Sequence, residues 1–331
     1  MTRLEHGYVT EAAQRNIGFF LADSFNMLPF ISALEPLRIA NRLSRKPLYQ
    51  WSLISESGQG VSSSNGMVHT ADFSVDAFTS STSPEFSMII VCGPFSPSDF
   101  HHEPTLQWLR RKNHKQTLIA GLETGCHILA QAGLLRGLHC TTHWENMGEF
   151  VTAYPDSKVS TDVYEIDRNL ITCSGGCAPM DMMLYIIEQH HGYELASSVA
   201  DSMIHPHRRS KSEPQRMDIG SRIGVNHPAL VECIELMESN IEQPLTPNEL
   251  ASLIGFSKRQ LERLFRRHLN TTPARYYLDL RLEVARGMLE KSAYRVIDIA
   301  LMCGFKSSGH FSSRYLSSFG VTPRETRKEA S

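Results

Sequence analysis

The last third of the chain contains one segment twice, and this repeat restricts what the C-terminal part can fold into. Residues 250–273, LASLIGFSKRQLERLFRRHLNTTP, align with residues 299–323, IALMCGFKSSGHFSSRYLSSFGVTP, at an offset of 49 up to the Gly-Phe turn and 50 after it. Each copy combines a short apolar helix, a glycine turn and a second helix with one apolar face, which is the pattern of a helix-turn-helix. With a connecting helix expected over 273–292, the repeat predicts an all-α domain that contains two helix-turn-helix units.

The second helix of the first copy has an apolar face and a basic face. Ser257 is expected to cap this helix. At about 100° per residue, the core face consists of Leu261, Leu264, Phe265 and His268. The outward residues predicted to contact bases and phosphates are Arg259, Arg263 and Arg266, and those predicted to contact phosphates alone are Lys258 and Arg267. The alternative for this basic face is an ordinary solvated helix surface.

The second copy carries less charge. Its predicted DNA-facing residues are Ser308, His310, Ser312, Ser313 and Arg314. This copy either reads fewer bases than the first or mainly holds the DNA backbone. A rigid connecting helix would place the two recognition helices in successive major grooves, about 34 Å apart.

The charge of the chain is unevenly distributed. Residues 257–331 contain 15 Lys and Arg against 7 Asp and Glu, a net charge of +8. Because the whole chain has a net charge of −2, residues 1–256 carry −10. An acidic body with a basic tail indicates a C-terminal surface that binds a polyanion.

The first 200 residues alternate between apolar strand-like runs and amphipathic helices. The runs lie at 16–22, 49–55, 86–93, 116–122, 138–144 and 161–176, and the helices at 28–43, 105–113, 124–135 and 179–192. Such alternation predicts a flavodoxin-like α/β domain, with a mostly parallel sheet between helices. Ligands of these sheets bind at the carboxyl ends of the strands. We expect an α/β domain over 1–204, a polar linker over 205–227 and the helical domain over 228–331.

The composition excludes several classes of protein. The seven cysteines are odd in number and scattered, which favours reduced thiols in a cytoplasmic protein. We expect no metal and no cofactor, because the Cys and His residues show no ligand spacing. We also expect no membrane span or signal peptide, because no apolar run approaches the ~18 residues that a bilayer requires.

Residues 118–135, LIAGLETGCHILAQAGLL, form a sharp strand-to-helix turn of the kind that presents a nucleophile at the head of a helix. The residue at the turn is Glu123, and the only thiol in the segment is Cys126, one helical turn further on. A buried free cysteine is usually inert, so Cys126 is expected to pack inside the helix layer.

The C-terminal domain resembles the DNA-binding domain of the AraC/XylS family of bacterial transcription regulators. The motifs that carry this resemblance are the two Gly-Phe turns, LERLFRRH, RLEVARGML and the closing FGVTP. One position departs from the family, which commonly has a basic residue where this chain has Ser313. That departure leaves base contacts from the second copy open.

The N-terminal domain resembles the class I glutamine amidotransferase-like superfamily, in its branch of intracellular proteases and deglycases. The matching segments are IGFFLADSF, MIIVCGP, LIAGLETGCHILAQAGLLRG, CTTHWE and ITCSGGCAPMDMMLYIIEQHHG. By this resemblance the cysteine nucleophile of the enzymes falls on Glu123, their glutamate falls at Leu28-Pro29, and only His143 remains. The resemblance therefore implies an inactive enzyme fold kept as a ligand sensor, as in regulators of glycine betaine, carnitine and arginine catabolism.

We predict an effector site around Glu123. A carboxylate at a helix N-terminus stays ionised, and with an aromatic face it recognises a quaternary ammonium or guanidinium group. The predicted ligand-binding residues are Asn26, Glu123, Thr124, His143, Trp144 and Glu145. The alternatives are that Glu123 caps its helix or pairs with an arginine, that Trp144 packs in the core, and that His143 is a structural hydrogen-bonding group.

The chain is thus predicted to be a ligand-responsive activator of catabolic genes that binds promoter DNA. Expected partners are a small-molecule effector, RNA polymerase and a second copy of the chain. One alternative is an active cysteine hydrolase or deglycase that uses Cys126 and carries a DNA-binding appendage. Another is a constitutive DNA-binding protein whose N-terminal domain only dimerises.

Overall fold

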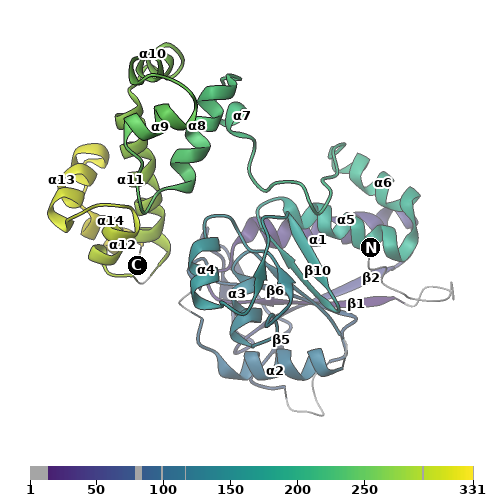
Figure 1. The fold of residues 1–331 in the computed structure, drawn as a ribbon. Coiled ribbons are helices and arrows are strands. Elements are labelled where there is room, and N and C mark those ends of the chain that lie inside the picture. The colour runs from purple at the N-terminus through teal and green to yellow at the C-terminus, as the bar shows by residue number, and fades with distance from the viewer. Residues whose placement is uncertain (1–13, 79–83, 98–99, 116, 293, 331) are drawn as a thin grey trace. The chain divides into compact units, whose positions relative to one another are not determined.

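The computed structural model describes residues 14–78, 84–97, 100–115, 117–292 and 294–330. The chain forms two compact units that divide between Gln215 and Arg216 (Figure 1). No helix within the described ranges is long and apolar enough to cross a membrane.

The first unit is built on a seven-stranded sheet in the order β10-β11-β7-β6-β1-β2-β5. Each neighbouring pair is parallel except β10 and β11, which form an antiparallel hairpin at one edge. The strands are β1 (Arg15–Leu21), β2 (Tyr49–Ser55), β5 (Phe73–Ser74), β6 (Met88–Cys92), β7 (Leu118–Leu122), β10 (Tyr164–Asp167) and β11 (Leu170–Cys173). The predicted α/β class with a mostly parallel sheet is confirmed.

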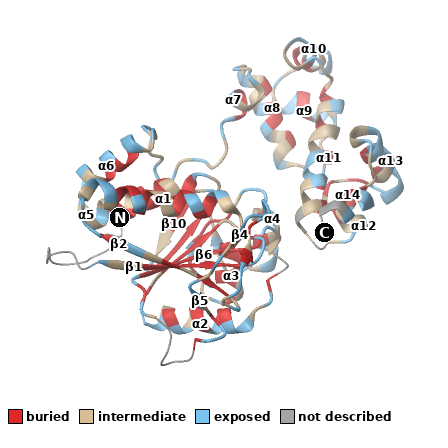
Figure 2. Ribbon diagram, turned by 180° about the vertical axis from the view of Figure 1, so that it is seen from behind, coloured by how far each residue is buried: buried red, intermediate tan, exposed pale blue. Residues whose placement is uncertain are grey.

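Helices cover both faces of this sheet, so its central strands are buried on both sides, as Figure 2 shows. On β1, Phe19 belongs to the core on one face and Phe20 to the core on the other. The first face packs against α1 (Met27–Ser44), α5 (Ala178–His191) and α6 (Tyr193–Ser202), and the second against α2 (Glu103–His114) and α3 (Gly125–Gln131). This double burial explains why the strands read as continuous apolar runs.

Two of the expected strands were wrong in extent. In the run 138–144 only His139–Cys140 (β8) is a strand, and it pairs with β9 (Lys158–Val159) in a separate two-stranded sheet. The run 161–176 is the β10–β11 hairpin rather than one strand. Several elements of the first unit were not predicted from the sequence: β3 (Val61–Ser62), β4 (Val68–His69), β5, β9, α4 (Met147–Ala153) and α6.

The second unit is entirely helical. It contains α7 (Ile219–Ile223), α8 (Pro228–Ser239), α9 (Pro247–Leu253), α10 (Lys258–Leu269), α11 (Pro273–Lys291), α12 (Val296–Met302), α13 (Ser308–Phe319) and α14 (Pro323–Ala330). The two predicted helix-turn-helix units are α9–α10 and α12–α13. Each has its own core, and α11 joins them by placing Tyr277 in the first core and Leu282, Ala285 and Leu289 in the second.

Local signals set the limits of the recognition helices. The Ser257 hydroxyl accepts a hydrogen bond from the Gln260 backbone N–H, and the Gln260 side chain accepts one from the Ser257 N–H at 2.7 Å. The predicted cap is therefore confirmed as a full capping box. Gly255 and Gly304 occupy equivalent turns with the same φ of 71°, a left-handed conformation that favours glycine.

The segment expected to be a linker, 205–227, is divided between the two units. Residues 205–215 hydrogen-bond to the first unit, for example through His205 and Asp181 at 2.7 Å. Residues 216–227 belong to the second unit and include α7. The polar composition of this segment reflects ion pairs with the units rather than a free chain.

Replacing Gly304 by Ala is expected to destabilise the second unit more than replacing Gly255 by Ala. Both changes place a Cβ at positive φ, which costs about 1–2 kcal/mol. At Gly304 the new Cβ would also lie 2.6 Å from Pro244 Cδ, whereas at Gly255 nothing lies within 4 Å. Overpacking adds about 1–3 kcal/mol at Gly304.

Urea unfolding of the full chain, followed by far-UV circular dichroism, measures this difference. All three tryptophans lie in the first unit, so their fluorescence reports on that unit separately and serves as the internal control. An equal loss in the free energy of unfolding for the two variants would contradict the crowding at Gly304.

Candidate functional site

Glu123 lies at the predicted elbow, between β7 and α3, in a strained backbone conformation. Its φ is 53°, a value that few residues other than glycine adopt. The surrounding backbone holds it there: the Glu123 N–H donates to the Cys173 carbonyl at 2.8 Å, and its carbonyl accepts from Thr142 Oγ1 at 3.2 Å. Gly175 faces it so closely that an added Cβ would lie 2.6 Å from Glu123 Cβ. Strain of this kind, held by neighbouring structure, is typical of functional sites.

The Glu123 side chain lines a pocket of about 390 Å³ at the carboxyl end of the sheet. Its Oε1 atom accepts a hydrogen bond of 2.8 Å from Asn26 Nδ2, at the start of α1. The full lining is Asn26, Met27, Leu28, Pro29, Ser64, Asn65, Glu123, His143 and Gly176. The pocket thus brings together one carboxylate, two amides, an imidazole and the apolar first turn of α1.

Three of the six predicted ligand-binding residues line this pocket: Asn26, Glu123 and His143. The other three are not part of its lining. Thr124 is buried, and its Oγ1 has no hydrogen-bond partner among the described residues. Trp144 is 41% exposed, so it is not a core residue, and its ring lies 5.5 Å from that of His143. Glu145 Oε2 lies 3.8 Å from His143 Nδ1.

Sequence reasoning missed the contribution of residues 64–65 to the pocket. The Asn65-Gly66 pair is a hairpin-turn signal, and it connects β3 with β4. That signal predicts a turn, but only the tertiary structure places this turn beside Glu123. Leu28 and Pro29, which the resemblance aligns with the enzymes' glutamate, do lie in the pocket wall.

Cys126 lies inside the protein rather than in the pocket. It is fully buried, and its Sγ donates to the Gly121 carbonyl at 3.2 Å. Burial raises the pKa of the Cys126 thiol well above its usual value. A thiol whose pKa is raised forms less thiolate at neutral pH than an exposed cysteine does, so it is a poor nucleophile. Of the seven cysteines, all of them described, Cys177 alone is exposed.

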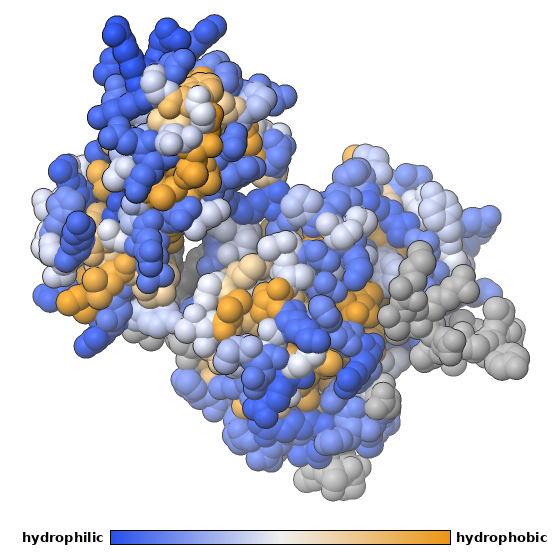
Figure 3. Space-filling model, viewed as in Figure 1, coloured by the Kyte–Doolittle hydropathy of each residue, from blue (hydrophilic) through white to orange (hydrophobic). Residues whose placement is uncertain are grey.

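A basic surface lies on α10. Its core face is buried as predicted at Leu261, Leu264 and Phe265, while His268 is only partly buried. The predicted DNA-contacting residues are all exposed: Lys258, Arg259, Arg263, Arg266 and Arg267. Figure 3 shows strongly hydrophilic atoms gathered over this helix.

The cations of α10 differ in their pairing from three arginines elsewhere in the second unit. Arg275, Arg286 and Arg295 each form a salt bridge, at 2.9, 3.0 and 2.8 Å, with a carboxylate three or four residues further on. Within the described ranges, no salt bridge joins the five α10 cations to a carboxylate. Unpaired cations can exchange solvent ions for phosphates without breaking an internal contact.

The second recognition helix, α13, presents a weaker surface. Ser308, His310, Ser313 and Arg314 are exposed, and Ser312 is partly buried. Arg314 Nε donates to His310 Nε2 at 3.3 Å, so these two side chains form one polar group. The only cation on this helix is thus already engaged in a hydrogen bond.

Among the described residues, no cluster of three His, Cys, Asp or Glu side chains is arranged to hold a metal ion.

An α/β unit with an elbow pocket, followed by two helix-turn-helix units, is the architecture of a DNA-binding regulator with a sensing domain. Residues 15–189 match the DJ-1/PfpI family, and residues 250–329 match a helix-turn-helix domain. The chain belongs to the DJ-1/PfpI family and, within it, to the transcriptional regulators that carry an AraC-type helix-turn-helix domain. The family resemblances predicted for both domains are confirmed.

Relatives along nearly the whole length are transcriptional regulators. The HTH-type transcriptional regulator GbdR of Pseudomonas aeruginosa is 39% identical over 314 residues, which cover 95% of this chain and 84% of the relative. GlxA of Rhizobium meliloti is 36% identical over 96% of both chains. A solved AraC family transcriptional regulator from Pseudomonas putida is 23% identical, covers 57% of this chain and 99% of its own, and shares the fold at a TM-score of 0.50.

Alkylation of the native protein with iodoacetamide is expected to modify Cys177 and to leave Cys126 unmodified until urea is added. The reason is the burial of the Cys126 thiol and the exposure of Cys177. Peptide mass spectrometry measures both sites in one sample. Rapid modification of Cys126 in the folded chain would contradict its placement in the core.

Proposed function

We propose that this regulator is an activator whose α/β unit binds a small cationic nitrogen metabolite at Glu123. Binding changes how the helix-turn-helix units engage promoter DNA of catabolic genes. The observation that carries this proposal is the carboxylate at the elbow, inside a pocket of about 390 Å³. By the family resemblance, the position that presents a nucleophile in enzymes of this fold here presents a carboxyl group.

The chemistry of the pocket favours a small cation. Its volume lies at the lower end of the range for ligand pockets, about 300–1,000 Å³. The Asn26 amide orients the carboxylate by donating to Oε1. The methyl groups of a quaternary ammonium would contact the apolar side chains of Met27, Leu28 and Pro29, with the cation facing Glu123. This arrangement suits glycine betaine, carnitine, methylated glycines or arginine.

The unit acts as a sensor and not as an enzyme. Thiol catalysis needs a thiolate within reach of a substrate, and the elbow position has none. The burial of Cys126 opposes the alternative of a cysteine hydrolase or deglycase.

DNA binding rests on α10. Arg259, Arg263 and Arg266 contact bases and phosphates, and Lys258 and Arg267 contact phosphates. α13, with Ser308, His310, Ser313 and Arg314, mainly holds the backbone of the neighbouring DNA turn. The active form is a homodimer that contacts RNA polymerase in the cytoplasm, where promoter DNA is available.

A thermal-shift screen of glycine betaine, carnitine, methylated glycines and basic amino acids tests the effector. A ligand that binds only the folded state stabilises it by about 2.7 kcal/mol at a hundredfold excess over Kd. The Glu123→Gln variant keeps the shape of the side chain and removes its charge, so it is expected to lose the shift.

Two controls accompany this screen. Glu35→Gln removes a carboxylate that pairs with Arg38 on the same unit, outside the pocket, and should keep the shift. The compound 3,3-dimethylbutanoate, which replaces the nitrogen of glycine betaine with carbon, should not bind. An unchanged shift for Glu123→Gln would refute the cation site.

Replacing Arg263 by Ala is expected to weaken binding to a promoter duplex by about 5- to 150-fold, and to relax sequence preference at one position. Replacing Lys258 by Ala should weaken binding to all sequences alike and lower the salt dependence. Fluorescence anisotropy at several salt concentrations measures both effects, with duplexes enriched from genomic fragments.

Arg38→Ala is the charge-matched control, since it also removes one positive charge but lies on α1 of the first unit. It is expected to leave DNA affinity unchanged. Equal affinity of Arg263→Ala and the parent chain for every duplex would show that Arg263 does not read bases.

A further inference from the structure

The last residues of the first unit, 205–215, are held against the rest of that unit by hydrogen bonds and ion pairs. We call residues 205–215 the anchor segment. Asp181, whose side chain is 1% exposed, accepts from His205 and Arg209, and Glu188 accepts from Arg208 at 2.6 Å. The buried carboxylate therefore binds the segment firmly where it leaves α6.

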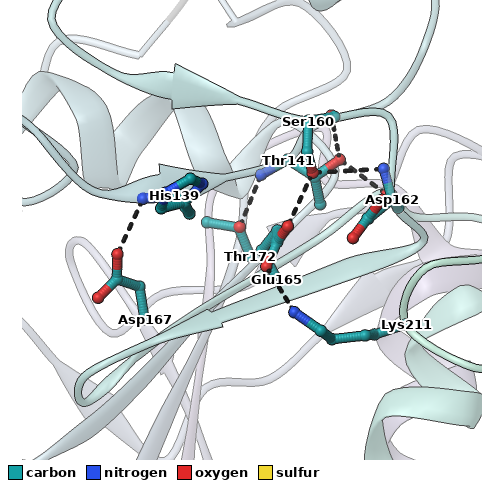
Figure 4. Close-up of polar contacts among 8 residues, drawn as sticks. All are labelled: His139, Thr141, Ser160, Asp162, Glu165, Asp167, Thr172 and Lys211. Atoms are coloured by element: carbon teal, nitrogen blue, oxygen red, sulfur yellow. Dashed lines mark hydrogen bonds and ion pairs between the residues drawn. The ribbon is translucent and has the colours of Figure 1, made fainter. Parts of the chain in front are cut away.

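The second half of the anchor segment follows the edge strand of the sheet. The Val163 N–H donates to the Lys211 carbonyl at 2.9 Å, and Lys211 Nζ lies 3.2 Å from Glu165 Oε2. Figure 4 shows this ion pair beside Thr141, which bonds to Thr172, Ser160 and Asp162. The segment thus reaches the loop that follows β8.

Gln215, the last residue of the first unit, is held by this loop. Its Nε2 donates to Thr141 Oγ1 at 3.0 Å, to the Thr142 carbonyl at 2.9 Å and to the Asp162 carbonyl at 3.0 Å. Two of these acceptors are carbonyls that cannot donate, so the orientation of the amide is determined. The next residue, Arg216, already pairs with Glu238 of the second unit at 3.4 Å.

The same loop forms part of the effector pocket. Thr142 Oγ1 donates to the carbonyl of Glu123, and His143, the next residue, lines the pocket. Thr141 and Thr142 are fully buried, so their close-packed neighbours leave these two residues little room to shift independently of the adjoining pocket wall. The short segment 141–143 thus contacts Gln215 through Thr141 and Thr142 and lines the pocket through His143.

We infer that Gln215 couples the sensor to the DNA-binding unit by controlling the length of free chain between them. The inference rests on the proposed effector site. A ligand bound at Glu123 and His143 fixes the 141–143 loop and keeps Gln215 anchored. When the pocket is empty, Gln215 is released more often, and the chain is free back to Lys211. The four residues 212–215 then add up to about 14 Å of reach.

Limited trypsin digestion of the full chain tests the anchor. Cleavage after Lys211 requires residues on both sides to leave the surface, so its rate follows the population of the released state. Gln215→Ala removes the side-chain amide, whose two N–H groups are shared among three acceptors, and is expected to raise this rate at least tenfold. Gln215→Glu, which places a carboxylate against two carbonyl oxygens, should raise it further. Mass spectrometry identifies the 1–211 fragment.

Gln131→Ala is the matched control for this digestion. Gln131 is also partly buried and also donates to a carbonyl, that of Phe100 at 3.2 Å, but it lies outside the anchor segment and the 141–143 loop. The Gln131→Ala variant should be cleaved after Lys211 at the same rate as the parent chain. An unchanged rate of cleavage after Lys211 in Gln215→Ala would show that Gln215 does not hold the segment in place.

Two measurements test the coupling. Glycine betaine, carnitine or arginine, whichever gives a thermal shift, should slow cleavage of the parent chain at least threefold, and should bind Gln215→Ala without changing its DNA affinity. An unchanged or faster rate in the parent, or a DNA response retained in Gln215→Ala, overturns the coupling. The effector site would still stand in that case, because the thermal shift reports on it separately.

The second measurement needs no ligand. Thr142→Val removes the hydrogen bond to Glu123 and should speed cleavage after Lys211 at least threefold. Thr105→Val, which removes an equally buried hydroxyl that bonds to His102, should not. If none of the ligands binds the parent chain, the proposed effector class fails, and Thr142→Val alone decides whether the loop carries the coupling.

Discussion

The strained turn at Glu123 is the constraint on which the rest of the sensing unit depends. A left-handed backbone at a residue other than glycine costs about 1–3 kcal/mol and persists only where its neighbours enforce it. Here the Cys173 carbonyl, the Thr142 hydroxyl and the close approach of Gly175 enforce it. The result is a carboxylate that faces the pocket and accepts from Asn26, and a backbone carbonyl that accepts from Thr142, in the loop that also contacts Gln215.

In the DNA-binding unit, the arrangement of charge matters more than its amount. Arg275 and Arg286 on α11, and Arg295 just before α12, pair with carboxylates one helical turn away, whereas the cations of α10 form no such pair within the described ranges. The negative charge of residues 1–256 is used in part for ion pairs inside each unit. Asp181 and Glu188 hold the anchor segment, and Glu238 holds Arg216 and Arg222. The cations of α10 thus remain exposed and without a carboxylate partner among the described residues.

Much of the fold could be predicted from the sequence because its signals are local or periodic. The apolar runs predicted β1, β2, β6 and β7, and the repeated Gly-Phe turn predicted both helix-turn-helix units. The prediction was wrong for residues 138–144, where a two-residue strand pairs outside the main sheet. It also took 205–227 for a linker, since a polar segment held by ion pairs and a free polar segment have the same composition.

The sequence by itself determined the class of each unit and the core face of α10, because these follow from periodicity, and it placed Glu123 at the strand-to-helix turn. That Glu123 stands where the enzymes have their nucleophile is what the family resemblance implies. Only the tertiary structure decided which side chains meet at the pocket. Residues 26, 64–65, 123 and 143 come from four separate parts of the chain, and no local pattern relates them. It also decided that Cys126 is buried and that Gln215 touches the pocket loop. Contacts of this kind depend on how close-packed elements fit together, and that information is absent from any single segment.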